Sequence, residues 1–208
     1  SVSYIVNNID RLAAFSASIS RLEAFQGKVE EIGKAEIKLG TQKDSLDARI
    51  LLEKVDLVIP QTKRCLIKDL SLEVAPGQRV LVVGPSGCGK TSFLRMISGL
   101  WQPGAGEIQR PSFSELLFIP QKPYMLLGSL REQLCYPKDS ARFSNQHLRS
   151  VLEEVCLPEL NERYPDFDIK QDWPRLLSLG EQQRLAFGRL LLNSPRVVVL
   201  DEATSALD

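Results

Sequence analysis

The sequence predicts an α/β fold with a parallel β-sheet, and two features of the 208-residue chain point to it. A glycine-rich segment at 84–91 lies between an apolar run at 79–83, suited to a buried strand, and a helical pattern that opens at 91–97. Four consecutive apolar residues at 197–200 run directly into two acidic residues. A bare apolar run of this kind is typical of a central parallel strand that is covered on both faces.

The first 50 residues predict a helix followed by a linker. Apolar side chains recur every three or four residues through 1–26, which indicates one amphipathic helix that stops near Gly27. Packing of that stripe against a neighbouring element is a commoner use than a dimerising coiled coil. Residues 28–49 are charged, contain two glycines and carry little apolar content, so we expect a linker there.

From residue 50 onward, strand-like and helical segments alternate, so one domain is expected over 50–208. The β-like runs on either side of a Pro-containing turn indicate a hairpin. A dipeptide Ser-Pro separates the last helix from the apolar run at 197–200. Strands are expected at 50–59, 66–74 and 116–119, a turn at 60–64, and helices within 129–164 and at 180–193.

Composition excludes several classes of protein. Lys plus Arg and Asp plus Glu number 26 each, so no net positive field attracts nucleic acid, and no nucleic-acid partner is expected. The four cysteines lie far apart without a CxxC pair, which argues against a zinc site and a disulfide framework and suits a reducing compartment. No apolar run approaches the roughly 20 residues of a membrane-spanning helix.

The segment Gly-Pro-Ser-Gly-Cys-Gly-Lys-Thr at 84–91 fits the P-loop pattern G-x-x-x-x-G-K-[ST]. Backbone N–H groups of such a loop point inward at a helix N-terminus, where the helix dipole favours a phosphate. Lys90 can reach the β- and γ-phosphates, and the Thr91 hydroxyl can bind Mg²⁺. A glycine-rich turn beside a surface lysine is the alternative, but the flanking strand and helix patterns favour a nucleoside triphosphate. The predicted nucleotide-binding residues are Gly84, Pro85, Ser86, Gly87, Cys88, Gly89, Lys90, Thr91 and Ser92.

The acidic pair after 197–200 provides a second group of candidate residues, in the manner of a Walker B strand. Asp201 would reach the Mg²⁺ held by the nucleotide and Thr91. Hydrolysis also needs a group that orients the attacking water and accepts its proton, and we assign this role of general base to Glu202. Many buried strands end in exposed acids, so the assignment depends on the P-loop upstream.

Between these two motifs, residues 177–184 read Leu-Ser-Leu-Gly-Glu-Gln-Gln-Arg, which closely resembles the LSGGQ-type signature of ATP-binding cassette (ABC) ATPases. The resemblance implies a P-loop NTPase of ABC type: a RecA-like core with an antiparallel β subdomain and a helical signature subdomain. It further implies that Ser178, Gly180 and Glu181 close on the γ-phosphate of ATP held by a second subunit, since a helix N-terminus attracts anions. Ser178 as a simple helix N-cap is the alternative.

Two further residues match motifs of the same family. Gln121, which follows Phe-Ile-Pro, resembles the Q-loop glutamine, and this implies contacts with Mg²⁺ and the reacting centre and a position facing the transmembrane partner. Asp208, which ends Ser-Ala-Leu-Asp, resembles the D-loop aspartate that crosses the dimer interface. The resemblance therefore implies a Mg²⁺-dependent ATPase that binds ATP between two heads.

Finer marks resemble the D subfamily, the fatty-acyl transporters of peroxisomes, and its cyanobacterial and plastid half-transporter relatives. These marks are Cys88 in the P-loop, Gly-Leu-Trp at 99–101, Pro-Tyr-Met at 123–125, Gly-Ser-Leu-Arg-Glu-Gln-Leu at 128–134, and Trp173.

This resemblance implies that a transmembrane domain precedes the ATPase head and that residues 1–27 are its end. The head would face the cytosol or the stroma, and two subunits, identical or different, would move a hydrophobic or acylated substrate across a membrane. A soluble ABC-type ATPase is an alternative. A truncated fragment that binds nucleotide without turnover is another.

Two departures from the family pattern bear on these expectations. The region 57–60 lacks the aromatic residue that stacks on adenine, so base discrimination is expected to be weaker; a stacked base contributes roughly 1–3 kcal/mol in nucleic-acid binders. The family's switch histidine and the strand between its two Walker strands would lie beyond Asp208. The domain is therefore expected to be C-terminally incomplete, marginally stable and a poor ATPase by itself.

Overall fold

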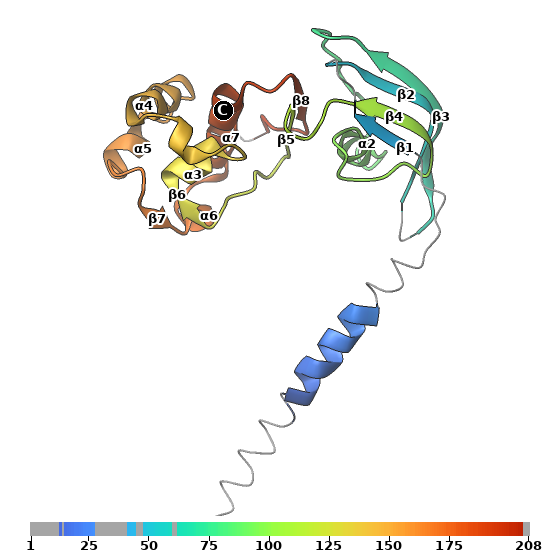
Figure 1. Cartoon of the computed structure of the whole chain (residues 1–208), viewed down its shortest axis with the longest axis horizontal. Coiled ribbons are helices and arrows are strands. Elements are labelled where there is room, and N and C mark those ends of the chain that lie inside the picture. The colour runs from blue at the N-terminus through green and yellow to red at the C-terminus, as the bar shows by residue number, and fades with distance from the viewer. Residues whose placement is uncertain (1–12, 14, 28–40, 45–47, 60–61, 206–208) are drawn as a thin grey trace, which may run out of the picture. The chain divides into compact units, whose positions relative to one another are not determined.

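A computed structural model describes residues 13, 15–27, 41–44, 48–59 and 62–205, and the statements below concern these residues (Figure 1). The chain divides into two units, residues 1–38 and 39–208. The first unit contains an α-helix over 15–27, which agrees with the predicted helix where it is described. Phe15, Leu22 and Phe25 on this helix are exposed. Within the described part of the chain, no helix is both long enough and apolar enough to span a membrane.

The second unit contains a four-stranded sheet of order β1-β4-β2-β3. Strand β2 is antiparallel to both β3 and β4, and β1 is parallel to β4. The predicted hairpin is confirmed, and Ile59 donates its N–H to the carbonyl of Arg64 beside the turn (2.9 Å). The strands are β1 (Thr41–Asp44), β2 (Ile50–Val58), β3 (Cys65–Val74) and β4 (Ala105–Arg110).

Strand β1 differs from the expectation, because Thr41–Asp44 falls within the predicted linker. The edge of β4 presents a row of backbone donors and acceptors, and a neighbouring segment that pairs with them satisfies both rows. Thr41 lies opposite Glu107 and Asp44 lies opposite Arg110 in the parallel register. The rest of the predicted linker, except residues 48–49, lies outside the described residues.

Helix α2 (Lys90–Ile97) follows the glycine-rich loop and packs on one face of this sheet, as Figure 1 shows. Its apolar side chains are buried because they face the strand residues that point the same way. The result is one apolar core between helix and sheet. Its buried members include Phe93, Met96 and Ile97 from α2 and Leu52, Val55, Leu57 and Ile108 from the strands.

A second layer is helical, and it confirms the helices predicted within 129–164 and at 180–193. Its core includes Trp173, whose fully buried indole N–H donates to the carbonyl of Gly128 (2.7 Å) and is thereby satisfied. The elements are β6 (Gly128–Ser129), α3 (Leu130–Cys135), a 3₁₀ turn (Ser140–Arg142), α4 (Asn145–Glu154), α5 (Pro158–Arg163), β7 (Lys170–Gln171), α6 (Trp173–Leu176) and α7 (Leu179–Asn193).

The strands predicted at 116–119 and 197–200 are confirmed as β5 (Leu116–Ile119) and β8 (Val197–Leu200), and the structure pairs them in parallel. The prediction that both faces of β8 are covered is wrong. Val199 is buried, but Val198 and Leu200 on the other face are 38% and 46% exposed. Successive side chains of a strand point to opposite faces, so one face of β8 lacks a covering layer among the described residues.

The predicted strand at 79–83 is also wrong, because the segment is irregular. Leu81 and Val83 are 84% and 78% exposed. A strand exists only while a neighbour pairs with its backbone groups. None of the strands in the described ranges pairs with this segment, so its apolar composition alone does not make it a strand.

The structure requires glycine at position 106, near the start of β4. Its φ is +86°, and a Cβ there would lie 2.4 Å from the carbonyl oxygen of Lys54 in the irregular part of β2. Gly77 has a similar φ of +77°, but a Cβ there would meet nothing within 4 Å. An added Cβ would therefore meet only the strain of a positive φ at Gly77, but both that strain and a clash with the backbone at Gly106.

We expect Gly106→Ala to destabilise the protein by more than about 2 kcal/mol, since it adds a collision with a carbonyl to the strain of a positive φ. Gly77→Ala adds only the strain and should cost about 1 kcal/mol. Urea unfolding of the two variants measures the difference. Equal losses would mean that β2 yields to the added methyl group at no cost.

Candidate nucleotide-binding site

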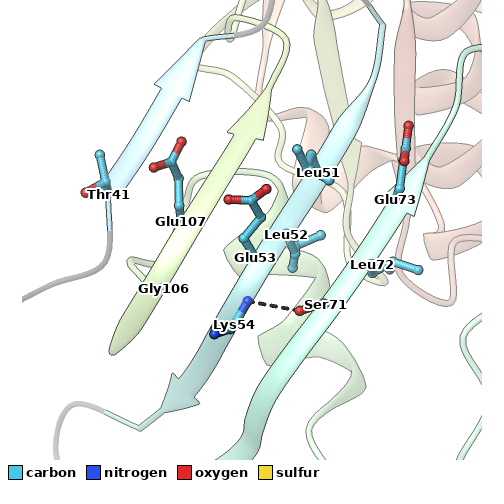
Figure 2. A pocket seen from close by; sticks show the side chains of 10 residues that line it. All are labelled: Thr41, Leu51, Leu52, Glu53, Lys54, Ser71, Leu72, Glu73, Gly106 and Glu107. Carbon is cyan, nitrogen blue, oxygen red and sulfur yellow. Dashed lines mark hydrogen bonds between the residues drawn. The ribbon is translucent and has the colours of Figure 1, made fainter.

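A broad hollow of about 920 Å³ lies on the face of the sheet that carries Glu53, Glu73 and Glu107 (Figure 2). A hydrogen bond from Lys43 lowers the pKa of Glu107, so this carboxylate stays ionised at neutral pH. The lining carries three carboxylates, of which Glu107 pairs with Lys43 (2.8 Å) and Glu73 with Arg49 (3.4 Å), so these two cations are already engaged and Glu53 adds a negative charge that repels a triphosphate. The hollow is therefore a poor site for a nucleotide.

The glycine-rich loop leads into the N-terminus of α2, where an anion is favoured. Gly89 is the N-cap residue with a φ of 106°, and no side chain caps the helix. The first turn of α2 contains no acidic residue. Its first N–H groups have no acceptor within the helix, and they carry the positive end of the helix dipole. The sequence thus builds a site for phosphate at this point.

Lys90 places a positive charge on the same loop. Its ammonium donates to the carbonyls of Gly84 (2.8 Å) and Pro85 (3.0 Å). These two bonds fold the side chain back along the loop and place its charge at the first residues of the loop. An ammonium in this place adds to the attraction for a phosphate chain.

Thr91 and Asp201 meet, although 110 residues separate them. The Thr91 hydroxyl donates to the Asp201 carboxylate (3.0 Å). Asp201 is only 6% exposed, and its N–H donates to the carbonyl of Ile119 at the end of β5 (3.0 Å). The pairing of β8 with β5 therefore sets the position of this carboxylate.

The oxygens of Thr91 and Asp201 fit Mg²⁺. This ion prefers hard oxygen ligands and is usually held by one or two protein groups together with phosphates and waters. Over the described residues, no three His, Cys, Asp or Glu side chains gather in a way that could hold a metal. The pair thus suits an ion that arrives with a nucleotide better than one that needs a protein cage.

Gln121 and Glu202 form a second close pair. The Gln121 amide donates to the Glu202 carboxylate (3.0 Å), and both side chains are exposed. Glu202 has a φ of 49°, the left-handed region that costs a non-glycine residue about 1–2 kcal/mol. The N–H of Ser205 donates to the carbonyl of Glu202 and closes the turn (3.1 Å). This conformation directs the carboxylate toward Gln121.

Ser178 caps helix α7 in a reciprocal arrangement with Glu181. The Ser178 hydroxyl accepts the N–H of Glu181 (3.2 Å), and the Glu181 carboxylate accepts the N–H of Ser178 (2.7 Å). Burial opposes ionisation of Glu181, but its contacts with Ser178 and an ion pair with Arg163 outweigh burial and lower its pKa. Gly180 lies in the first turn behind this cap.

The structure separates these residues into groups. Lys90 contacts the loop, Thr91 contacts Asp201, and Gln121 contacts Glu202. Among the described residues, no hydrogen bond or ion pair joins the 178–181 group to the loop at 84–92. Asp208 lies outside the described residues.

Sequence reasoning missed Gln183, whose buried side chain joins Gln121 to Ser205. It also missed Arg163 as the ionic partner of Glu181. Both lie beside or within α7, but nothing in their spacing distinguishes them from ordinary helix residues. A polar side chain at a helix position that faces the core is the one signal that points to Gln183.

A loop of amides and one ammonium at a helix N-terminus, beside a hydroxyl–carboxylate pair suited to Mg²⁺, defines a P-loop nucleotide-binding domain. The sequence profile of the family described as "ABC transporter" matches residues 67–205. An uncharacterized ABC transporter ATP-binding protein of Synechocystis is 46% identical over all of this chain and 32% of its own length. The chain belongs to the ABC transporter family.

Other similar proteins are members of the D family of ABC transporters. ABC transporter D family member 2, chloroplastic, of Arabidopsis thaliana is 33% identical over 99% of this chain and 39% of its own length. ATP-binding cassette sub-family D member 3 of Rattus norvegicus is 37% identical over 95% of this chain and 33% of its own length. The chain thus spans about a third of the length of these relatives.

A solved structure supports the fold. A bacterial Atm1-family ABC exporter with ATP bound matches 81% of this chain and 31% of its own, with a TM-score of 0.67 and 27% identity. The mixed α/β architecture is therefore that of a P-loop ABC domain, as the sequence predicts.

Glu181→Gln is expected to destabilise α7 by roughly 0.5–1 kcal/mol at neutral pH, because it weakens the cap and the ion pair. The folded-state pKa of Glu181 is lowered, so its stabilisation is present above the unfolded-state pKa and is lost as pH falls through the folded-state value. Urea unfolding between about pH 7 and pH 3 should therefore show the gap between wild type and variant closing in acid. Glu162→Gln, an exposed change on α5, is the matched control; a gap of constant size would contradict the assignment.

Proposed function

We propose that residues 50–208, with the loop at 84–92 at their centre, bind and hydrolyse ATP with Mg²⁺. The observation that carries the proposal is the hydrogen bond from Thr91 to Asp201. It brings the end of the glycine-rich loop to the end of β8, as an NTPase requires. ATPase activity is also what membership of the ABC family implies.

In this proposal the protein binds the triphosphate through the backbone N–H groups of Gly84, Ser86, Gly87, Cys88 and Gly89, the ammonium of Lys90 and the first turn at Ser92. Pro85, which has no N–H, would contribute only to the shape of the loop. Bound Mg²⁺ supplies neutralisation of phosphate charge, and Thr91, Asp201 and Gln121 would hold it. Glu202 accepts the proton of the attacking water, and Gln121, its hydrogen-bond partner, orients that carboxylate.

We further propose that two heads dimerise around ATP. Ser178, Gly180 and Glu181 would approach the γ-phosphate on a second subunit, and Asp208 would cross the interface. The cap supports this role: the N–H of Glu181 is taken by Ser178, while Leu179 and Gly180 precede the first residue whose N–H bonds within the helix. Those two N–H groups, with the helix dipole, suit a phosphate from outside the domain.

For the whole protein we propose an ABC half-transporter that moves a hydrophobic or acylated substrate across a membrane. A transmembrane domain upstream, ending in residues 1–27 and joined through the segment near 28–49, would anchor a head that faces the cytosol or the stroma. The likeness to D family members from plant and animal supports this choice. The partner would be a second half-transporter, identical or different, and not a nucleic acid.

Glu202→Gln is expected to lower the rate of Mg-ATP hydrolysis by the intact protein at least 100-fold, because the amide cannot accept the proton.

Lys90→Ala instead should weaken binding of Mg-ATP by roughly 10- to 100-fold, the value of a charge-assisted hydrogen bond. Phosphate release and fluorescent-nucleotide titration measure the two effects. An unchanged rate in Glu202→Gln would refute its role as the base, and unchanged affinity in Lys90→Ala would refute the nucleotide site.

The intact protein is expected in the membrane fraction of cells and to resist extraction by high salt or carbonate, because spanning helices leave the bilayer only with detergent. Fractionation followed by immunoblotting tests this. Release by salt alone would favour a soluble ABC-type ATPase.

A further inference from the structure

Gln183 on α7 is fully buried, and its side chain reaches two segments outside its own helix. Its amide nitrogen donates to the backbone carbonyl of Gln121, 62 residues away (2.9 Å). The same nitrogen donates to the hydroxyl of Ser205, 22 residues away (3.3 Å). An amide NH₂ has two hydrogens, so the two bonds use its whole donor capacity.

The two segments that Gln183 holds are those that carry the candidate catalytic pair. Gln121 supplies the side-chain amide that donates to the Glu202 carboxylate. Ser205 supplies the N–H that closes the left-handed turn at Glu202. Gln183 therefore holds the backbone of Gln121, whose side chain donates the hydrogen bond, and the turn that carries Glu202, whose carboxylate accepts it.

The neighbouring Gln182 shows what an ordinary buried glutamine does here. It is 6% exposed, and its amide donates to the carbonyls of Leu177 (2.9 Å) and Pro174 (3.3 Å). Both acceptors belong to the segment that leads into α7. Gln182 thus stabilises the helical layer, whereas Gln183 reaches out of it to two loops at the ends of β5 and β8.

We propose that Gln183 is a positioning residue for ATP hydrolysis, which couples helix α7 to the Gln121–Glu202 pair. The inference rests on the proposed function, since it assumes that Glu202 is the base. A helix moves as a rigid element, so a displacement of the α7 N-terminus, where Ser178 caps the helix, carries Gln183 with it. The Gln121 carbonyl and Ser205 then shift together, and the carboxylate changes its orientation.

Gln183→Met in the intact protein tests this, because methionine keeps the length and approximate volume of glutamine and removes both donors. We expect kcat for Mg-ATP to fall at least tenfold while the Kd for the nucleotide stays within twofold, since no nucleotide-binding group changes. Gln182→Met is the matched control. It also loses a buried amide from α7, and it should alter kcat by less than twofold. Thermal unfolding of both variants checks that each is folded at the assay temperature.

A double substitution makes the test specific. Gln121→Ala removes the side-chain amide that donates to Glu202, so Gln183 no longer positions that hydrogen bond. Gln183→Met should then lower kcat by a clearly smaller factor than it does in wild type. An equal factor in both backgrounds would overturn the coupling.

The outcomes separate this inference from the proposed function. If wild type hydrolyses ATP and Glu202→Gln does not, but Gln183→Met and Gln182→Met lower kcat alike, the positioning role alone is refuted. If Glu202→Gln retains full activity, the role of Glu202 as the base is refuted and the positioning role loses its premise. If wild type does not hydrolyse ATP, the proposed function itself fails. Should Gln183→Met fail to fold, Ser205→Ala replaces it, because this change removes one acceptor of Gln183 on an exposed residue. A threefold or greater fall in kcat supports the inference, and a wild-type kcat overturns it.

Discussion

The hydrogen bond between Thr91 and Asp201 joins the two parts of the second unit that chemistry needs together. Thr91 lies in the first turn of α2, which packs on the four-stranded sheet, and Asp201 directly follows β8, which pairs with β5. Because Asp201 is almost fully buried, its carboxylate is costly unless a donor meets it. The contact therefore fixes the distance between a phosphate-binding loop and a carboxylate suited to Mg²⁺, and the rest of the site is arranged around it.

The helical layer contributes to the site through buried polar side chains. Arg189 of α7 donates to the carbonyls of Gln133 (2.6 Å) and Tyr124 (2.7 Å), and Gln133 exchanges hydrogen bonds with the backbone of Leu126. Burial lowers the pKa of Arg189 to about 10, so it remains charged at neutral pH and keeps all its donors. The segment that follows Gln121 is thus held from α7, as Gln121 itself is held by Gln183.

Two predictions from apolar composition were wrong for one physical reason. The run at 79–83 and the strand β8 both have the composition of buried parallel strands. In the structure the first is irregular and the second has one face exposed. Burial and strand pairing are properties of the neighbours, and composition states only that such neighbours would be favourable. The same reason explains why the charged segment Thr41–Asp44 became a strand beside β4.

The sequence by itself determined the glycine-rich loop at 84–91, the acidic pair after β8, the helix N-terminus at Ser178 and the family. These signals are local: each depends on residue types a few positions apart, which set backbone freedom, charge and capping. Only the tertiary structure decided the direct hydrogen bonds: Thr91 to Asp201, which the motifs had placed at one Mg²⁺, Gln121 to Glu202, and Gln183 to the backbone of Gln121. Contacts between distant residues depend on how layers pack, and no local spacing encodes them.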